Sequence, residues 1–242
     1  CTEKGIPVMY APGRNSGAVA EFTVGLMIAA TRNIVSCHQS FHNEKKWRGD
    51  MYAYSYIGNE LSNSTVGLVG FGAIGSKVTR ILNAFGSKVI VYDPYISEEA
   101  KKEFNCRFVD LDTLLRESDI VSLHARYTAE TYQIIGAEQI EMMKNTAYLI
   151  NTARGELVDH EALYSALKAK RIAGAALDVF EKEPPEDSSE LFQLDNVIAC
   201  THLAGASRQA ALIGAQKACE GILQILTGQK PEFCANKEVL ER

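Results

Sequence analysis

A short glycine pattern constrains the fold of this chain more than any other feature. Residues 70–75 read GFGAIG, follow an apolar run at 66–69, and lead into a helical pattern at about 73–85 that Gly86 ends. A strand, a tight glycine turn and a helix in this order predict the first unit of a doubly wound parallel sheet. Because free N–H groups at the start of such a helix face an anion, the pattern also predicts binding of a dinucleotide pyrophosphate.

Each glycine of this pattern has a physical role, and an acidic residue completes the pattern. Gly70 permits the turn, Gly72 lets the backbone approach the phosphates, and Gly75 lets the helix pack closely on the strand. Asp93 lies eighteen residues beyond Gly75, at the end of the next expected strand. A carboxylate there binds the ribose hydroxyls and repels a 2′-phosphate, which predicts NAD rather than NADP. The alternative is that Asp93 and Pro94 only form a turn.

Strands and helices alternate along the rest of the chain. This alternation indicates an α/β fold of the Rossmann class, a parallel sheet with helices on both faces. The strands expected after the glycine loop are 88–92, 107–109, 120–124, 147–151, 172–177 and 197–200, with helices at about 97–104, 110–116 and 159–170. We also expect a strand at 6–10, a buried helix at 17–35, an irregular aromatic arm at 41–64 and a final amphipathic helix at 205–227.

Composition excludes several classes of function. The net charge of −5 provides no attraction to nucleic acid or to an anionic membrane, so we expect neither as a partner. The apolar stretch at 24–30 is too short to cross a bilayer, and the first residues resemble no signal peptide. Six cysteines without a CxxC pair favour reduced thiols in a cytoplasmic enzyme and predict no metal site.

Three polar residues follow expected strands, at the sheet edge where doubly wound folds bind ligands: Arg154, Glu183 and His202. An arginine can bind a carboxylate with two hydrogen bonds and polarise a carbonyl, and a histidine can accept a hydroxyl proton. A carboxylate beside the histidine orients its ring and favours the imidazolium. The alternatives are a surface cation for Arg154, a solvated acidic loop for Glu183 and a helix-capping residue for His202.

The chain resembles the D-isomer-specific 2-hydroxyacid dehydrogenases from about Gly5 to its C-terminus. Five stretches carry the resemblance: 5–23, the glycine loop at 66–75, INTARG at 150–155, GAALDVFEKEP at 174–184 and THLAG at 201–205. The resemblance implies an NAD-dependent oxidoreductase that interconverts a small D-2-hydroxy acid and its 2-keto acid. It names no single acid.

The resemblance also implies roles for individual residues. Arg154 would bind the substrate carboxylate and carbonyl, His202 would be the general acid and base, and Glu183 would be its partner. Asp178 would bind the nicotinamide carboxamide. The residues expected to contact the cofactor are Gly70, Gly72, Ala73, Ile74, Gly75, Asp93, His124, Thr152, Ala153, Asp178 and Ala204.

Two departures from the family pattern stand out. The usual His-x-Pro-Leu-Thr is replaced by HARYT at 124–128, so Arg126 and Tyr127 stand where an apolar pair lines the adenine side. Arg126 could favour a 2′-phosphate, which Asp93 opposes. In addition, about a hundred residues of a smaller flavodoxin-like substrate-binding domain are absent. We therefore expect a fragment of a longer protein, with the cofactor domain at 14–204 and remnants of the split substrate domain at 1–13 and 205–242.

The resemblance further implies a homodimer formed through the cofactor domain, with residues 17–35 and the arm around Trp47 at the interface. The alternative is that these aromatic side chains fold back on their own domain. Two other functions stay open: an NAD(H)-sensing regulator of the same fold, such as a co-repressor, and a module that only binds the cofactor.

Overall fold

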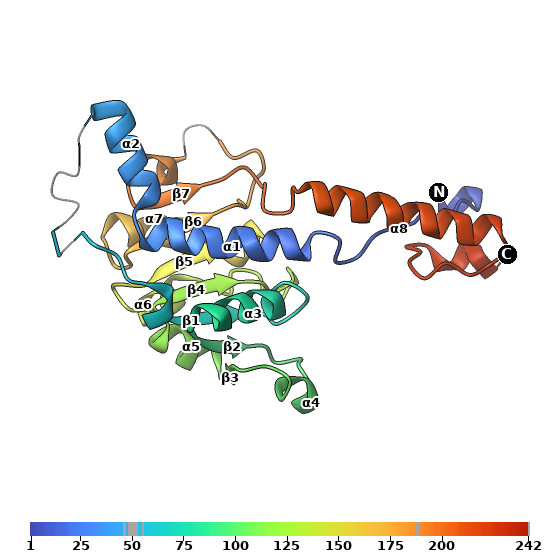
Figure 1. The fold of residues 1–242 in the computed structure, drawn as a ribbon, viewed down its shortest axis with the longest axis horizontal. Coiled ribbons are helices and arrows are strands. Elements are labelled where there is room, and N and C mark those ends of the chain that lie inside the picture. The colour runs from blue at the N-terminus through green and yellow to red at the C-terminus, as the bar shows by residue number, and fades with distance from the viewer. Residues whose placement is uncertain (46, 48–52, 55, 187–188, 242) are drawn as a thin grey trace. The chain divides into compact units, whose positions relative to one another are not determined.

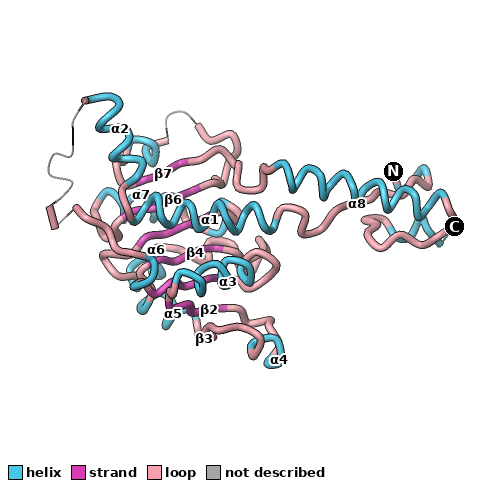
Figure 2. Tube along the Cα trace, in the orientation of Figure 1, coloured by secondary structure: helices cyan, strands magenta, loops and turns pink. Residues whose placement is uncertain are grey.

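The computed structural model describes residues 1–45, 47, 53–54, 56–186 and 189–241. The chain forms two compact units, one made of residues 19–204 and the other of residues 1–18 together with 205–242. Figure 1 shows the order of the elements along the chain, and Figure 2 shows how helices and strands are distributed. The larger unit contains the whole sheet, and every residue proposed above for a site lies in it.

The larger unit is built on one sheet, whose described part contains seven strands, all parallel. Their order is β3-β2-β1-β4-β5-β6-β7, so the direction of chain progression reverses between β1 and β4 (Figure 1). In such sheets a ligand crevice opens at this reversal, beyond the carboxyl ends of the strands. The strands are β1 Thr65–Val69, β2 Lys88–Tyr92, β3 Arg107–Phe108, β4 Ile120–Leu123, β5 Tyr148–Asn151, β6 Gly174–Leu177 and β7 Val197–Ala199.

Helices cover both faces of the sheet. The α-helices of the larger unit are α1 Ser16–Thr31, which begins in the smaller unit, α2 Ile34–Glu44, α3 Gly75–Phe85, α4 Glu98–Lys101, α5 Leu111–Glu117, α6 Ala137–Met142 and α7 His160–Lys168, and its short 3₁₀ helices are η3 Leu61–Asn63, η4 Gly155–Leu157 and η5 Glu190–Gln193. The smaller unit contains α8 Arg208–Leu226 and the 3₁₀ helices η1 Thr2–Lys4 and η6 Lys237–Glu241. Apolar residues of α1 and α3 form one buried cluster with the sheet, and those of α5, α6 and α7 form another.

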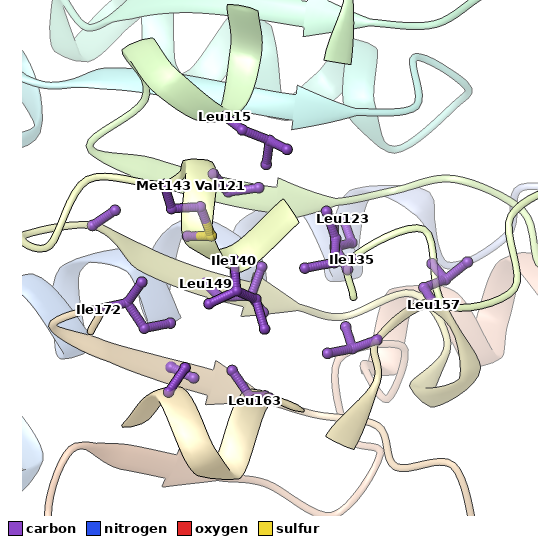
Figure 3. Packing of buried hydrophobic residues seen from close by; sticks show 14 of the residues in the cluster. Leu115, Val121, Leu123, Ile135, Ile140, Met143, Leu149, Leu157, Leu163 and Ile172 are labelled. Atoms are coloured by element: carbon purple, nitrogen blue, oxygen red, sulfur yellow. The ribbon is translucent and has the colours of Figure 1, made fainter. Parts of the chain in front are cut away.

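Adjacent residues of a strand contribute to opposite faces of the sheet. Leu149 belongs to the cluster under α5, α6 and α7, and Ile150 belongs to the cluster under α1 and α3. Figure 3 shows Leu149 beside Ile140 of α6, in the cluster under α5, α6 and α7. Because both faces are buried, the central strands are almost entirely apolar, which explains why they were recognisable in the sequence.

The expected strand at 6–10 is wrong. Only Met9 forms a bridge, to Cys234, and the side chains of Ile6 and Tyr10 are about half exposed, at 50% and 48%. The side chain of Asn236 accepts a hydrogen bond from the Val8 N–H and donates one to the Ile6 carbonyl. A polar side chain therefore satisfies backbone groups that a neighbouring strand would otherwise bind.

The expected helix at 17–35 is in fact two helices. The first, α1, ends at Thr31, and α2 runs from Ile34 into the region expected to be an irregular arm. Asn33 between them has a φ of 55°, a left-handed conformation that asparagine tolerates better than most residues. Of the expected arm, residues 46, 48–52 and 55 lie outside the described residues.

Smaller differences concern the ends of elements. The last helix begins at Arg208 rather than at 205, because the Ser207 hydroxyl accepts a hydrogen bond from the Ala210 N–H and caps it there. The helix α6 was not expected. No single helix among the described residues combines the length and apolar composition of a membrane span, although α1 and α2 do so as a pair bent by 62°.

Candidate active site

The glycine loop adopts a conformation that requires glycine. Gly70 has a φ of 97°, and a Cβ atom there would lie 2.5 Å from the Ala125 nitrogen. A Cβ atom on Gly75 would lie 2.5 Å from the Gly70 carbonyl oxygen, whereas one on Gly72 would meet only open space. Gly70 and Gly75 thus allow close packing of the backbone, and Gly72 borders free space where a ligand fits.

The helix that follows this loop begins without a side-chain cap. Within the described residues, the N–H groups of Gly72, Ala73 and Ile74 donate to no protein acceptor. Unpaired amides at a helix start, together with the helix dipole, favour an anion. The free space beside Gly72 and these three donors fit the pyrophosphate of a dinucleotide.

Asp93 connects the end of β2 to the glycine loop. One carboxylate oxygen accepts a hydrogen bond from the Phe71 N–H at 2.7 Å, and the other accepts one from the Tyr95 N–H at 2.9 Å. The second bond closes a turn at Asp93 and Pro94, which was the alternative interpretation of this pair in the sequence. Asp93 therefore forms this turn and also holds the glycine loop.

A hollow of about 510 Å³ lies beside Asp93, at the carboxyl ends of β2 and β3. Its lining residues include Asp93, Asp110 and Lys101. Lys101 is paired with Glu98 at 2.5 Å. Because Glu98 compensates Lys101, the lining carries a net negative charge, which repels a phosphate group.

His124 supports the glycine loop from the end of β4. Its Nε2 atom hydrogen bonds with the Ser122 hydroxyl at 3.0 Å, and among the described residues its buried Nδ1 atom has no partner. Burial lowers the pKa of His124 to about 4, so the ring is neutral at pH 7. Its Cβ atom lies 3.8 Å from the position a Cβ atom on Gly75 would take.

A tight turn after β5 presents Arg154. The Asn151 side chain accepts a hydrogen bond from the Ala153 N–H and donates one to the Arg154 carbonyl, which closes the turn. The Arg154 guanidinium is exposed and donates to the Ala153 carbonyl at 2.6 Å. Gly155 then passes so close to the loop after β6 that a Cβ atom would lie 2.0 Å from the Phe180 carbonyl carbon.

Asp178 at the end of β6 is fully buried and fixes the loop that carries His202. Its two carboxylate oxygens accept hydrogen bonds from the N–H groups of Leu203 and Ala204, both at 2.8 Å. Its carbonyl accepts a third bond, from the His202 N–H. His202 is held at a φ of 57°, a left-handed conformation that three bonds to one residue stabilise.

His202 and Glu183 form a direct pair. The His202 Nδ1 atom lies 2.6 Å from one carboxylate oxygen of Glu183, and the other accepts a hydrogen bond from the Phe180 N–H. Burial raises the pKa of Glu183, but hydrogen bonds from His202 and Phe180 and the charge of Arg154 outweigh burial and hold it below its usual value. An ionised carboxylate on Nδ1 leaves Nε2 available to exchange a proton.

Residues 24–204 match the family described as D-isomer specific 2-hydroxyacid dehydrogenase, NAD binding domain. This chain belongs to that family. It is 45% identical to the glyoxylate reductase of Thermofilum pendens, a match that covers 99% of this chain and 71% of the relative. It is 40% identical to the D-3-phosphoglycerate dehydrogenase of Archaeoglobus fulgidus, over 99% of this chain and 45% of the relative.

Solved structures agree with this assignment. The crystal structure of D-lactate dehydrogenase with NAD⁺ from Lactobacillus jensenii superposes with a TM-score of 0.87 at 32% identity, covering 97% of this chain and 73% of that chain. An acyclic imino acid reductase in complex with NADPH and D-Arg superposes with a TM-score of 0.82 at 31% identity. The comparisons give no support to the regulator alternative.

The family assignment confirms the fold class, the cofactor and the reaction type expected from the sequence. The dehydrogenase has a Rossmann fold, binds NAD and is an oxidoreductase that acts on small 2-hydroxy or 2-keto acids. The roles of single residues stay predictions, as does the division at 14–204. The structure divides the chain at 18/19 and 204/205.

The structure of the dehydrogenase reveals contacts that sequence reasoning missed. Thr152 and Ala204 are buried, and the Thr152 hydroxyl is 2.7 Å from that of Thr23 in α1. Neither Thr23 nor Asn151 was singled out, although an asparagine directly before the arginine turn is a recognisable turn signal. The contact of Gly155 with Phe180 could not be expected, because it joins loops that follow two different strands.

Proposed function

We propose that Arg154, Glu183 and His202 are the catalytic residues of this dehydrogenase. The observation that carries the proposal is the 2.6 Å contact between His202 Nδ1 and Glu183, beside the charge of Arg154. The alternatives of a surface cation, a solvated acid and a capping histidine do not account for the way these three groups converge. Three separate loops, after β5, β6 and β7, bring them to one edge of the sheet.

The chemistry divides among these residues. A bound NAD⁺ would supply the acceptor for the hydride that leaves C2 of the hydroxy acid. The Nε2 atom of His202 takes the hydroxyl proton, and Glu183 stabilises the imidazolium that forms. The Arg154 guanidinium binds the substrate carboxylate and polarises the oxygen that becomes the carbonyl. In the reductive direction, the His202 imidazolium returns the proton to that oxygen.

We propose that the residues of the glycine loop hold the cofactor phosphates through their free N–H groups, and that Asp93 holds the adenosine ribose. Thr152 and Ala153 would line the nicotinamide end, with Asp178 reaching the carboxamide through oxygen lone pairs that Leu203 and Ala204 leave unused. His124 would either contact the cofactor through its unpaired Nδ1 atom or act only by supporting the glycine loop.

The substrate is a small 2-keto acid, and the relatives suggest which acids to try first. NADH oxidation with glyoxylate, hydroxypyruvate, pyruvate and 3-phosphohydroxypyruvate, by a protein that includes the expected substrate-binding domain, tests the function directly. We expect turnover of at least one of them, with glyoxylate as the first candidate because of the Thermofilum relative. NADH binding by that protein without turnover of any of the four would contradict this function and favour an NAD(H)-binding regulator.

The expected substrate-binding domain has its own test. We propose that residues 1–13 and 205–242 belong to a domain that needs further residues to bind substrate carboxylate. A protein of only these 242 residues should then bind NADH but reduce 2-keto acids poorly. Turnover at ordinary enzyme rates by these residues alone would contradict this proposal.

We also propose a homodimer formed through α1, α2 and the residues that follow. Ile34 and Phe41 of α2 and Trp47 beyond it are exposed, and Trp47 packs edge-on against Phe41 at 6.0 Å. Light scattering should report a dimer that Phe41→Glu dissociates and that Phe85→Glu, at an exposed position at the end of α3, leaves intact. We place the enzyme in the cytoplasm, since all its cysteines are free thiols.

A further inference from the structure

A hydrogen bond joins two loops that flank the glycine loop. The Tyr95 hydroxyl donates to the Glu130 carboxylate at 2.5 Å. Tyr95 follows β2 and Glu130 follows β4, and in the sheet β1 lies directly between these two strands (Figure 1). The bond therefore crosses beyond the carboxyl end of β1, where the glycine loop begins.

The Tyr95 side of this bond is held in place by backbone contacts. The Tyr95 N–H donates to Asp93, whose other carboxylate oxygen accepts from the Phe71 N–H. A continuous chain of bonds thus runs from the glycine loop through Asp93 to Tyr95 and Glu130. A displacement of the Tyr95 backbone would therefore also displace Asp93, the residue expected to hold the ribose.

The Glu130 side is held equally well. The Thr131 hydroxyl donates to the Arg126 carbonyl at 2.7 Å and accepts from the Thr128 N–H at 2.8 Å. These bonds close the loop 126–131 on itself and fix the position of Thr131, the residue next to Glu130. Little further ordering is needed for the carboxylate to reach Tyr95, so the bond can open and close without refolding either loop.

The pair contributes little to the fold. The Tyr95 side chain is 79% exposed, and exposed polar pairs add little to stability. The hydrogen bond to the Glu130 carboxylate raises the pKa of Tyr95, so the phenol stays protonated and remains a donor. A bond that the fold does not need, placed across the mouth of a ligand crevice, suggests a role in ligand retention.

We propose that Tyr95 and Glu130 form a latch across the adenosine end of the cofactor groove and slow the release of NAD(H). The latch concerns cofactor binding, which the family assignment establishes, and does not depend on the proposed roles of Arg154, Glu183 and His202. It adds two residues to the cofactor site that neither the glycine pattern nor the family motifs marked.

The test measures NADH dissociation by stopped-flow fluorescence and NADH affinity by titration. Tyr95→Phe keeps the ring and removes the donor, so the dissociation rate should rise about threefold to tenfold, the effect of one lost hydrogen bond of ordinary strength. Glu130→Ala should have a similar effect. The double variant should be no faster than either single variant, because both remove the same bond.

The matched control is Tyr164→Phe, which removes an exposed bond to Glu190 at 3.0 Å between α7 and η5. It should leave the dissociation rate unchanged. Equal rates in Tyr95→Phe and Tyr164→Phe would overturn the latch. Tighter NADH binding by Tyr95→Phe would also overturn it, because the pair would then occupy the place of the adenosine rather than close over it.

Discussion

Gly155→Ala gives a demanding test of how the two catalytic loops are positioned. The added Cβ atom would lie 2.0 Å from the Phe180 carbonyl carbon and 2.2 Å from the Glu181 nitrogen. Both contacts are with backbone, so no side-chain rotation can relieve them. Reaching ordinary contact at 3.4 Å requires the loops to separate by 3.4 − 2.0 = 1.4 Å.

Such a displacement acts on the residues proposed to do the chemistry. The Glu183 carboxylate is anchored by the Phe180 N–H and must move with that residue, away from Arg154 or from His202. A misplacement of about 1 Å in a catalytic group costs on the order of a hundredfold in rate. We therefore expect kcat/KM for 2-keto acid reduction to fall about a hundredfold, while NADH affinity changes little.

The assay compares Gly155→Ala with Gly25→Ala in the same chain. Gly25 lies in α1, and a Cβ atom there meets nothing within 4 Å. The control should keep full activity and gain slightly in thermal stability, since alanine favours a helix. If Gly155→Ala retained the activity of Gly25→Ala, the close approach of the two loops would have no part in positioning Glu183.

Three further results are expected. Arg154→Ala should raise KM for the 2-keto acid and lower kcat/KM by several orders of magnitude, with NADH affinity unchanged in a fluorescence titration. Asp93→Ala should narrow the preference for NADH over NADPH and weaken binding of NADH, measured as the ratio of the two dissociation constants. Burial lowers the pKa of His124 from 6.5 to about 4, so as the pH falls the unfolded chain binds this proton before the folded chain does. The free energy of unfolding therefore decreases as the pH falls from 6.5 toward 4, by up to about 3 kcal/mol. In His124→Gln the free energy of unfolding, measured in urea, should fall less between pH 7 and pH 5 than it does in the parent protein.

The sheet was predictable because its physical signals are local. Buried parallel strands are almost wholly apolar, as at Leu149 and Ile150, and Gly86 ends α3 in a left-handed conformation that glycine favours. The apolar run at 6–10 has the same local signal and is not a strand. Its outcome depends on Asn236, more than two hundred residues away, which binds its backbone instead.

The candidate site was predictable in its residue types but not in its supports. Arg154, Glu183 and His202 follow strands whose carboxyl ends share one edge, which the order of elements already implies. The buried bonds of Asp178 to the loop at 202–204 involve backbone N–H groups, which carry no sequence signal. The left-handed φ of His202 depends on the same bonds to Asp178, which join two loops and are not visible in the sequence.

The central claim is that His202, paired with Glu183, exchanges the substrate proton. The most direct measurement is the steady-state reduction of the best 2-keto acid by His202→Asn, with NADH affinity determined on the same sample. We predict that kcat falls at least about a thousandfold while the NADH dissociation constant stays within about twofold of the parent value. A variant that kept the parent kcat would show that another group moves the proton, and the proposed mechanism would be wrong.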